Sequence, residues 1–170
     1  ILADTTLNLP DFRAAERTFG LVTQVAGRAG RFVKGGRVIV QTYRPTSPVL
    51  ARAAAHDAEG FYADELAARR ELGFPPFSRL LRIVIRSKDA SRARSAAAEL
   101  AGRLAGTATV DVLGPAECPI AVVSGNVRWQ VLLRSADAAP ARAALTAALA
   151  GWKPAAAVYV EIDPDPVSLL

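Results

Sequence analysis

Apolar residues recur every three or four positions between residues 12 and 29, and this spacing predicts a helix. At about 100° per residue, one side of that helix carries the apolar positions Phe12, Ala15, Phe19, Val22, Ala26 and Ala29. The opposite side carries the polar positions Arg13, Arg17, Gln24, Arg28 and Arg31. Asp11 directly precedes the apolar pattern, so it is the expected N-cap.

The residues on either side of this helix read as pieces of a sheet. Residues 1–4 look like the end of a strand. Gly35 and Gly36 read as a turn, and residues 38–43 read as a buried strand. A helix followed directly by a buried strand is typical of an α/β domain.

Residues 47–72 predict a helical connector. Ser47 before Pro48 is a favourable helix start. The expected orientations are Phe61 and Leu66 inward, with Arg69 and Arg70 outward.

The chain divides near residue 75, where Gly73 offers a helix C-cap and the prolines at 75 and 76 prevent continuation. Beyond this point we expect strands at residues 80–87, 109–113, 127–134 and 158–163, and helices at residues 90–105 and 138–149. The order β-α-β-β-α-β is the split βαβ arrangement, an α+β fold with the first and third strands at the sheet centre.

Alternation along these strands assigns their two faces. Toward the helices we place Leu81, Ile83, Ile85, Val127, Trp129, Val131, Leu133, Val158, Val160 and Ile162, so Trp129 is expected in the core rather than stacked on a base. Toward an open second face we place Arg82, Arg86, Arg128, Gln130 and Arg134, with Tyr159, Glu161 and Asp163. The four arginines lie on the two central strands and would form a basic stripe.

Composition narrows the classes of protein. The net charge of the 170 residues is +5 and the pI is about 10, which favours a polyanionic partner. Residues 1–74 carry ten basic and eight acidic residues, against eleven and eight in 75–170, so neither part holds the charge alone. No apolar run approaches the ~20 residues of a membrane span. The chain starts on Ile1 without a methionine, so we expect a fragment of a longer protein.

The single cysteine, Cys118, excludes an internal disulfide and a metal site built from several cysteines. We expect it to be a small buried apolar residue. His56 has no second histidine or cysteine near it in the sequence, so it is assigned no metal.

The stretch TQVAGRAGR, residues 23–31, is the strongest candidate for chemistry. Arg28 and Arg31 stand among small residues, and the glycines at 27 and 30 each cost a helix about 1 kcal/mol relative to alanine. The arginine side of this helix shows no carboxylate, and the planar guanidinium suits phosphate oxygens. A solvated charged face is the alternative; we favour an anion site.

Several motifs together resemble one family. DFRAAERTFGLVTQVAGRAGR followed by GGRVIVQTYRP is similar to the sixth helicase motif and its next strand in the PriA (primosomal protein N′) family of superfamily 2 replication-restart helicases. PPFSRLLRIVI, VLGPAECPIAVVSGNVRWQVLLRS and VEIDPDPVSLL resemble that family's C-terminal domain. The resemblance implies the end of a RecA-like second lobe at 1–46, a helical connector at 47–74 and a βαββαβ C-terminal domain at 75–170.

The resemblance also assigns a nucleotide site. Gln24, Gly27, Arg28, Gly30 and Arg31 match the sixth motif, which faces ATP bound on the other lobe. Arg28 and Arg31 would be catalytic arginine fingers that stabilise charge on the transferred phosphoryl group. The resemblance implies ATP with Mg²⁺ and zinc ions in the longer protein; all the zinc ligands would lie outside this chain, which alone is not expected to hydrolyse ATP.

The function implied is that of an ATP-dependent 3′-to-5′ DNA helicase that recognises stalled or branched forks and loads the replicative helicase. Its implied partners are fork DNA, the single-stranded DNA-binding protein and the helicase-loading machinery, for a cytoplasmic, nucleoid-associated monomer. The stripe Arg82, Arg86, Arg128, Gln130 and Arg134 would bind DNA or the acidic tail of the single-stranded DNA-binding protein, or would pack on the motor. Two alternatives remain: a family member with an inactive motor that serves as a DNA-binding and loading scaffold, and an unrelated split-βαβ nucleic-acid-binding module.

Overall fold

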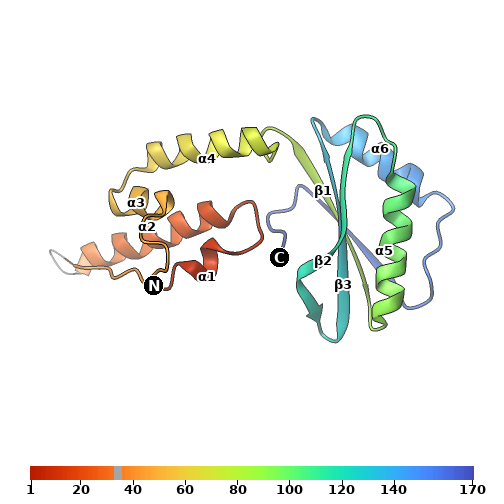
Figure 1. The fold of residues 1–170 in the computed structure, drawn as a ribbon, viewed down its shortest axis with the longest axis horizontal. Helices are drawn as coiled ribbons and strands as arrows, with labels where there is room; N and C mark the ends of the chain where they lie inside the picture. The colour runs from red at the N-terminus through yellow and green to blue at the C-terminus, as the bar shows by residue number, and fades with distance from the viewer. Residues whose placement is uncertain (33–35) are drawn as a thin grey trace. The chain divides into compact units, whose positions relative to one another are not determined.

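A computed structural model describes residues 1–32 and 36–170, and it leaves the side chains of residues 30–32 out of the description. The described chain forms two compact units, Ile1–Leu72 and Gly73–Leu170. Figure 1 shows helices in the first unit and a sheet with two helices in the second. The assignment of residues 1–46 to a helicase lobe and of 47–74 to a connector stays a prediction.

The first unit contains four helices within its described residues: α1 (Asp4–Leu7), α2 (Ala14–Phe32), α3 (Pro48–Ala54) and α4 (Ala58–Leu72). Its core gathers Ala3, Phe19, Val22, Leu50, Ala53 and Phe61. The rings of Phe19 and Phe61 stack with centroids 4.1 Å apart, which joins α2 to α4. The inward orientation of Phe61 is therefore confirmed, whereas Leu66 is 42% exposed and its predicted inward orientation is wrong.

The strand predicted at residues 38–43 is wrong for this structure. Ile39 is 83% exposed and Tyr43 is 89% exposed. A single parallel bridge joins Leu2 to Gln41, and the N–H of Ala3 donates to the Gln41 carbonyl at 3.0 Å. A strand needs neighbours to satisfy its main-chain groups, and the described chain supplies only this short contact. Within the described residues, this parallel bridge is the only part of the expected α/β arrangement that is seen, and the end of a RecA-like lobe stays a prediction.

Arg69 is the other orientation predicted incorrectly in this unit. Its side chain is buried, and its guanidinium lies within 2.8 Å of a Glu16 carboxylate oxygen and 2.7 Å of one from Glu65. Burial alone lowers the pKa of Arg69, but hydrogen bonds to Glu16 and Glu65 outweigh it and raise the pKa. Glu65 lies one turn before Arg69 on α4, but the apolar pattern of α4 could not reveal Glu16, because Glu16 lies on α2.

The second unit follows the predicted order of elements. Its strands are β1 (Arg79–Ser87), β2 (Asp111–Val123), β3 (Asn126–Ser135) and β4 (Tyr159–Pro164), and its helices are α5 (Ala90–Leu104) and α6 (Ala138–Leu149). The strands form one antiparallel sheet in the order β2-β3-β1-β4, so β1 and β3 are central as expected. Gly73, with a φ of +66°, follows the last residue of α4 as the predicted C-cap.

The main difference lies in β2, which runs to Val123 and is longer than predicted. Pro115 and Pro119 interrupt the alternating pattern that would have revealed the strand. The pairing of β2 with β3 shifts register between Leu113 and Ala116 and again between Glu117 and Val122. β2 is an edge strand, where prolines and bulges are tolerated.

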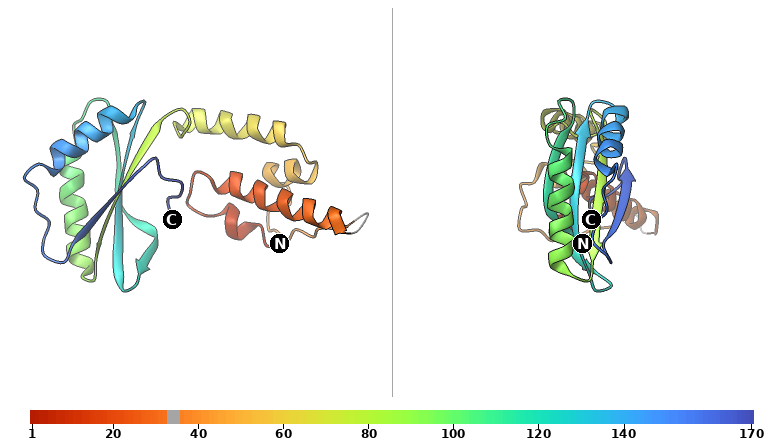
Figure 2. Two further views of the ribbon diagram at one scale, coloured as in Figure 1. Left: turned by 180° about the vertical axis from the view of Figure 1, so that it is seen from behind. Right: turned by 90° about the vertical axis from the view of Figure 1, so that its right-hand side faces the viewer.

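Both helices cover one face of the sheet, as Figures 1 and 2 show. Ile83, Ile85, Val131 and Leu133 are fully buried between sheet and helices, together with Leu100 of α5. Trp129 is partly buried and packs against this core, as predicted. The helix-facing assignment is thus confirmed for the central strands, while Ile162 on the edge strand β4 is 48% exposed.

The second face of the sheet is not fully open, contrary to expectation. The C-terminal residues return to it, as Figure 1 shows, on the side away from α5 and α6. The N–H of Asp165 donates to the Leu80 carbonyl at 2.8 Å, and Leu169 is 7% exposed. Leu80, Arg82, Val84 and Cys118 are buried there, which confirms the expected burial of the cysteine.

Candidate nucleotide- and nucleic-acid-binding surfaces

The N-terminal part of α2 is held by Asp11. The carboxylate of Asp11 accepts a hydrogen bond from the N–H of Arg13 at 2.9 Å, which is the geometry of an N-cap. The same carboxylate pairs with the guanidinium of Arg17 at 3.1 Å, and it is fully buried. The expectation that no carboxylate accompanies the arginines of this helix is therefore wrong for Arg17.

Arg13 is also held within the first unit. Its Nε is buried without a hydrogen-bond partner among the described residues. Its guanidinium carbon lies 5.2 Å from the centroid of the Phe12 ring, within range of a cation–π contact. Arg17 therefore stabilises the start of α2, and neither Arg13 nor Arg17 is fully exposed there.

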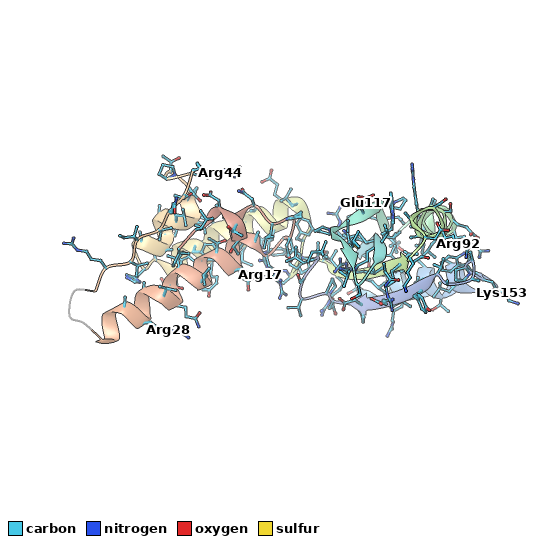
Figure 3. All side chains as sticks on the ribbon, turned by 90° about the horizontal axis from the view of Figure 1, so that it is seen from below. Arg17, Arg28, Arg44, Arg92, Glu117 and Lys153 are labelled. Carbon is cyan, nitrogen blue, oxygen red and sulfur yellow. The ribbon has the colours of Figure 1, made fainter. Side chains whose placement is uncertain are left out.

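The C-terminal part of α2 is different. Arg28 is exposed and, within the described part of the chain, makes no ion pair or side-chain hydrogen bond. Figure 3 places Arg28 toward the end of α2, far along the helix from Arg17. A Cβ added at Gly27 would meet nothing within 4 Å, so the helix surface beside Arg28 is bare. Gln24, one turn earlier, is exposed as well.

The other residues of the predicted nucleotide site are only partly described. The backbone of Gly30 and Arg31 belongs to α2. The side chain of Arg31 lies outside the described residues. Positions three apart on a helix share a side, so the helical backbone keeps residues 28 and 31 as neighbours.

An apolar hollow of about 600 Å³ lies elsewhere in the first unit. It is lined mainly by aliphatic residues of α2, α3 and residues 38–42, including Val22, Val38, Val40 and Leu50. Among the residues that the structure describes, none that lines this hollow is a lysine or an arginine.

On the second unit, Arg82 is buried under the C-terminal segment. It is 4% exposed, and its Nε donates to Oε1 of Gln130 at 2.8 Å. Its Nη1 donates to the main-chain oxygens of Ser168 at 3.2 Å and Leu170 at 3.0 Å. Arg82 thus holds the C-terminal segment against the sheet, and its guanidinium has no free path to a ligand.

Cys118 lies beside this guanidinium. Burial raises the pKa of the Cys118 thiol, and the positive charges of Arg82 and Arg128 only partly oppose that rise. The thiol is therefore mostly protonated at neutral pH and a poor nucleophile.

Arg134 and Arg86 face the second side of the sheet, and each has a carboxylate partner. Arg134 donates through Nε and Nη2 to one oxygen of Asp111, at 3.0 and 2.8 Å. Arg86 donates through Nε to Glu161. The predicted residues Arg82, Arg86, Arg128, Gln130 and Arg134 share a face but do not form one open basic stripe, because three of the arginines are compensated or covered within the unit.

Arg128 lies at the more open end of this face. The register pairs it directly with Arg86 on the neighbouring strand, and its Nη1 donates to the Ile120 carbonyl at 3.4 Å. Beside it, Arg86, Lys88, Asn126, Ala157 and Tyr159 line a hollow of about 490 Å³. Lys88 was not predicted as a site residue, since it lies one residue past β1; the alternation of β1, continued by one residue, would have placed it on the same face as Arg86.

Two structural tests bear on metals and membranes. Among the residues that the structure describes, no three or more His, Cys, Asp or Glu side chains gather as a metal site would need. Over the same residues, no helix is both long and apolar enough to cross a bilayer.

The chain is similar to known proteins over nearly its whole length. Residues 70–167 match the family model described as the primosomal protein N C-terminal domain. "Replication restart protein PriA" of Treponema pallidum (strain Nichols) is 48% identical over 170 residues, which cover 99% of this chain and 26% of the relative. The proteins of the same name from Bacillus subtilis (strain 168) and Synechocystis are each 37% identical over 99% of this chain, and the matches cover 22% and 20% of those relatives. The chain thus spans about a quarter or less of these relatives.

Proposed function

Since this chain belongs to the primosomal protein N C-terminal domain family, we propose that it forms the C-terminal part of a replication restart protein, an ATP-dependent DNA helicase. That protein would recognise stalled or branched forks and load the replicative helicase. The observation that carries the proposal is the match to replication restart proteins over 99% of the chain, since it includes the first unit with Arg28 as well as the second. Family membership excludes the alternative of an unrelated split-βαβ module.

In this proposal the end of α2 contributes to ATP hydrolysis. Arg28 and Arg31 would reach the terminal phosphate of ATP held elsewhere in the longer protein, and Gln24 would help orient them. The exposure of Arg28 and the bare surface at Gly27 support this role, because a finger must cross a cleft and its neighbours must allow close approach. A fixed guanidinium stabilises the charge that develops on the phosphoryl oxygens.

The longer protein would bind ATP with Mg²⁺. The ligands of the family's zinc ions would lie outside this chain, which has one cysteine. An inactive motor with a scaffold role stays the alternative, and the DNA-stimulated ATPase rate of the longer protein separates the two.

The second unit would contribute contacts to fork DNA. Phosphate contacts carry no sequence information, which suits a protein that must act at forks of any sequence. Arg86 and Arg128 are the proposed phosphate-binding cations of the second face. Arg82 and Gln130 would support that face from within, and Arg134 would act at its other end. The single-stranded DNA-binding protein and the helicase-loading machinery are the proposed partners, for a monomer that works at forks in the cytoplasm.

The salt dependence of binding tests the DNA contact. We expect the 170-residue chain to bind a labelled forked DNA, with the logarithm of the association constant falling by about 0.9 per phosphate contact for each tenfold rise in salt. Fluorescence anisotropy between about 50 and 200 mM salt measures that slope. Binding that does not change with salt, or no binding, would contradict phosphate recognition by this chain.

A further inference from the structure

The end of the sheet at Ser87, Asn126 and Tyr159 brings together Arg86 of β1, Arg128 of β3 and Lys88, the residue directly after β1. In an antiparallel sheet, the C-terminal end of β1 lies beside the N-terminal ends of β3 and β4. The register sets Arg86 opposite Arg128 on one side and opposite Tyr159 on the other. Lys88 directly follows the last residue of β1, and with Arg86 it lines the hollow of about 490 Å³ described above. We infer that this hollow binds the phosphodiester backbone of a nucleic-acid strand, an inference that rests on the proposed function and names its contact residues.

The local charge is not balanced within the chain. Directly opposed like charges on adjacent strands are unfavourable, as with Arg86 and Arg128. Glu161 compensates Arg86. Arg128 contacts a neutral carbonyl, and neither it nor Lys88 forms an ion pair with any residue that the structure describes. Two positive charges are therefore left to attract an anion.

The nearest acidic neighbour in sequence is already engaged. The carboxylate of Asp89 accepts hydrogen bonds from the N–H groups of Ser91 and Arg92 and so caps α5. It also lies 3.3 Å from Nε of Arg92. Asp89 is thus directed to the helix, and Lys88, which is exposed, keeps its charge for solvent or a ligand.

The remaining lining residues favour a nucleic acid over an acidic peptide. Tyr159 is 55% exposed, and the guanidinium of Arg86 lies 4.7 Å from its ring centroid. This flat aromatic and guanidinium surface suits a nucleotide. A peptide tail with apolar anchors would need an apolar wall, and Ala157 is the one aliphatic residue known to line the hollow. Asn126 adds an amide that can donate to a phosphate oxygen.

Charge-removing variants of the full 170-residue chain test this inference. We expect Lys88→Gln and Arg128→Gln each to weaken binding of forked DNA about three- to tenfold and to lower the salt slope by about 0.9. Lys153→Gln and Arg142→Gln are matched controls, since both residues are exposed on the same unit and outside the hollow; they should leave both values unchanged. Circular dichroism checks that each variant keeps its fold.

Substitutions at Tyr159 test whether a base of a single-stranded nucleic acid stacks on this ring. Tyr159→Leu should weaken binding of a single-stranded oligonucleotide while Tyr159→Phe should not, if a base stacks on the ring. A different result is that Lys88→Gln weakens the binding of single-stranded and duplex oligonucleotides equally, while Tyr159→Leu has no effect. That result would support recognition of the phosphates in both kinds of nucleic acid, without base stacking.

The outcomes separate this inference from the proposed function. If the unchanged chain binds forked DNA with a steep salt slope and both charge variants bind equally well, the inference is overturned and the proposed function stands. If those variants lose an acidic peptide and retain DNA, the hollow is a peptide site and the inference is likewise overturned. Absence of DNA binding by the unchanged chain would overturn the inference and the proposed DNA contact together.

Discussion

Arg28 and Arg82 carry the same side chain in opposite surroundings. Arg28 is exposed on a bare helix surface, and Arg82 is 4% exposed with its hydrogen bonds directed into its own unit. A basic residue on an alternating strand reads as a surface cation, because alternation gives only the face. The C-terminal segment that covers Arg82 is distant in sequence, so its presence could not be inferred from the strand.

Arg82 is predicted to hold the C-terminal segment in place. In Arg82→Met, the carbonyls of Ser168 and Leu170 and the amide of Gln130 lose their charged donor, so we expect the chain to unfold about 1–3 kcal/mol more easily. Cys118, now protected, should react at least about ten times faster with a thiol reagent, which measures the opening of this face.

Arg79→Met is the matched control for this change. Arg79 lies on the same strand and pairs with Asp165 at 3.3 Å, but both side chains are more than half exposed. Exposed pairs contribute little, so its thiol reactivity should stay close to that of the unchanged chain. Equal reactivity in Arg82→Met and the unchanged chain would show that Arg82 does not hold this face closed.

At the scale of elements, repeated patterns were predicted well. The apolar spacing of α2, the order β-α-β-β-α-β and the central position of β1 and β3 are confirmed, because helix and strand periods recur several times within each element. The length of β2 and the strand at residues 38–43 were predicted incorrectly. β2 contains prolines that break the alternation, and residues 38–43 have strand-like residues without the neighbouring strands that would pair with them.

The candidate site was predictable to a similar degree. The motif identified Arg28 by residue type and spacing, and the exposed position is consistent with it. The carboxylates on Arg17, Arg86 and Arg134 were missed, because Asp11, Glu161 and Asp111 come from other turns or strands. The alternation of a strand gives the face of each arginine but not the carboxylate on a neighbouring element that it will meet.

The stability of the start of α4 is predicted to depend on pH through the carboxylate of Asp57. The N–H of Gly60 donates to Oδ1 of Asp57 at 2.9 Å, and this bond, followed by the hydrogen bond from Arg52, lowers the pKa of Asp57 below its usual 3.8. A lowered folded pKa means that the ionised carboxylate stabilises the fold above pH 3.8 and that this contribution is lost as the pH falls through the lowered value.

Asp57→Asn keeps a capping acceptor and removes the charge. We expect it to lower the thermal midpoint of the helical signal at about pH 7, and we expect this effect to shrink as the pH falls below 3.8 through the lowered pKa of Asp57. Circular dichroism reports on this start of α4. Asp64→Asn, which also contacts Arg52 at 3.0 Å but does not cap the helix, should have the smaller effect; equal midpoints for Asp57→Asn and the unchanged chain at pH 7 would contradict the assignment.

At the scale of the molecule, two units carry separate tasks in this account. The first presents an exposed Arg28 on α2, the helix in which Arg17 is paired with Asp11 of the same unit. The second presents cations at one end of a sheet whose opposite face holds its core. Both matches, to the family model and to the replication restart proteins, extend across the junction at Leu72 and Gly73. This is consistent with one protein in which nucleotide and DNA contacts lie on different units.

The most direct measurement is the DNA-stimulated ATPase rate of the longer protein that contains this chain. Arg28→Ala and Arg31→Ala are each predicted to lower that rate by about 10³-fold or more, as expected for an arginine finger. Arg44→Ala, which removes an exposed cation of the same unit, should leave the rate unchanged. Rates within about twofold of the unchanged protein in both finger variants would contradict the account.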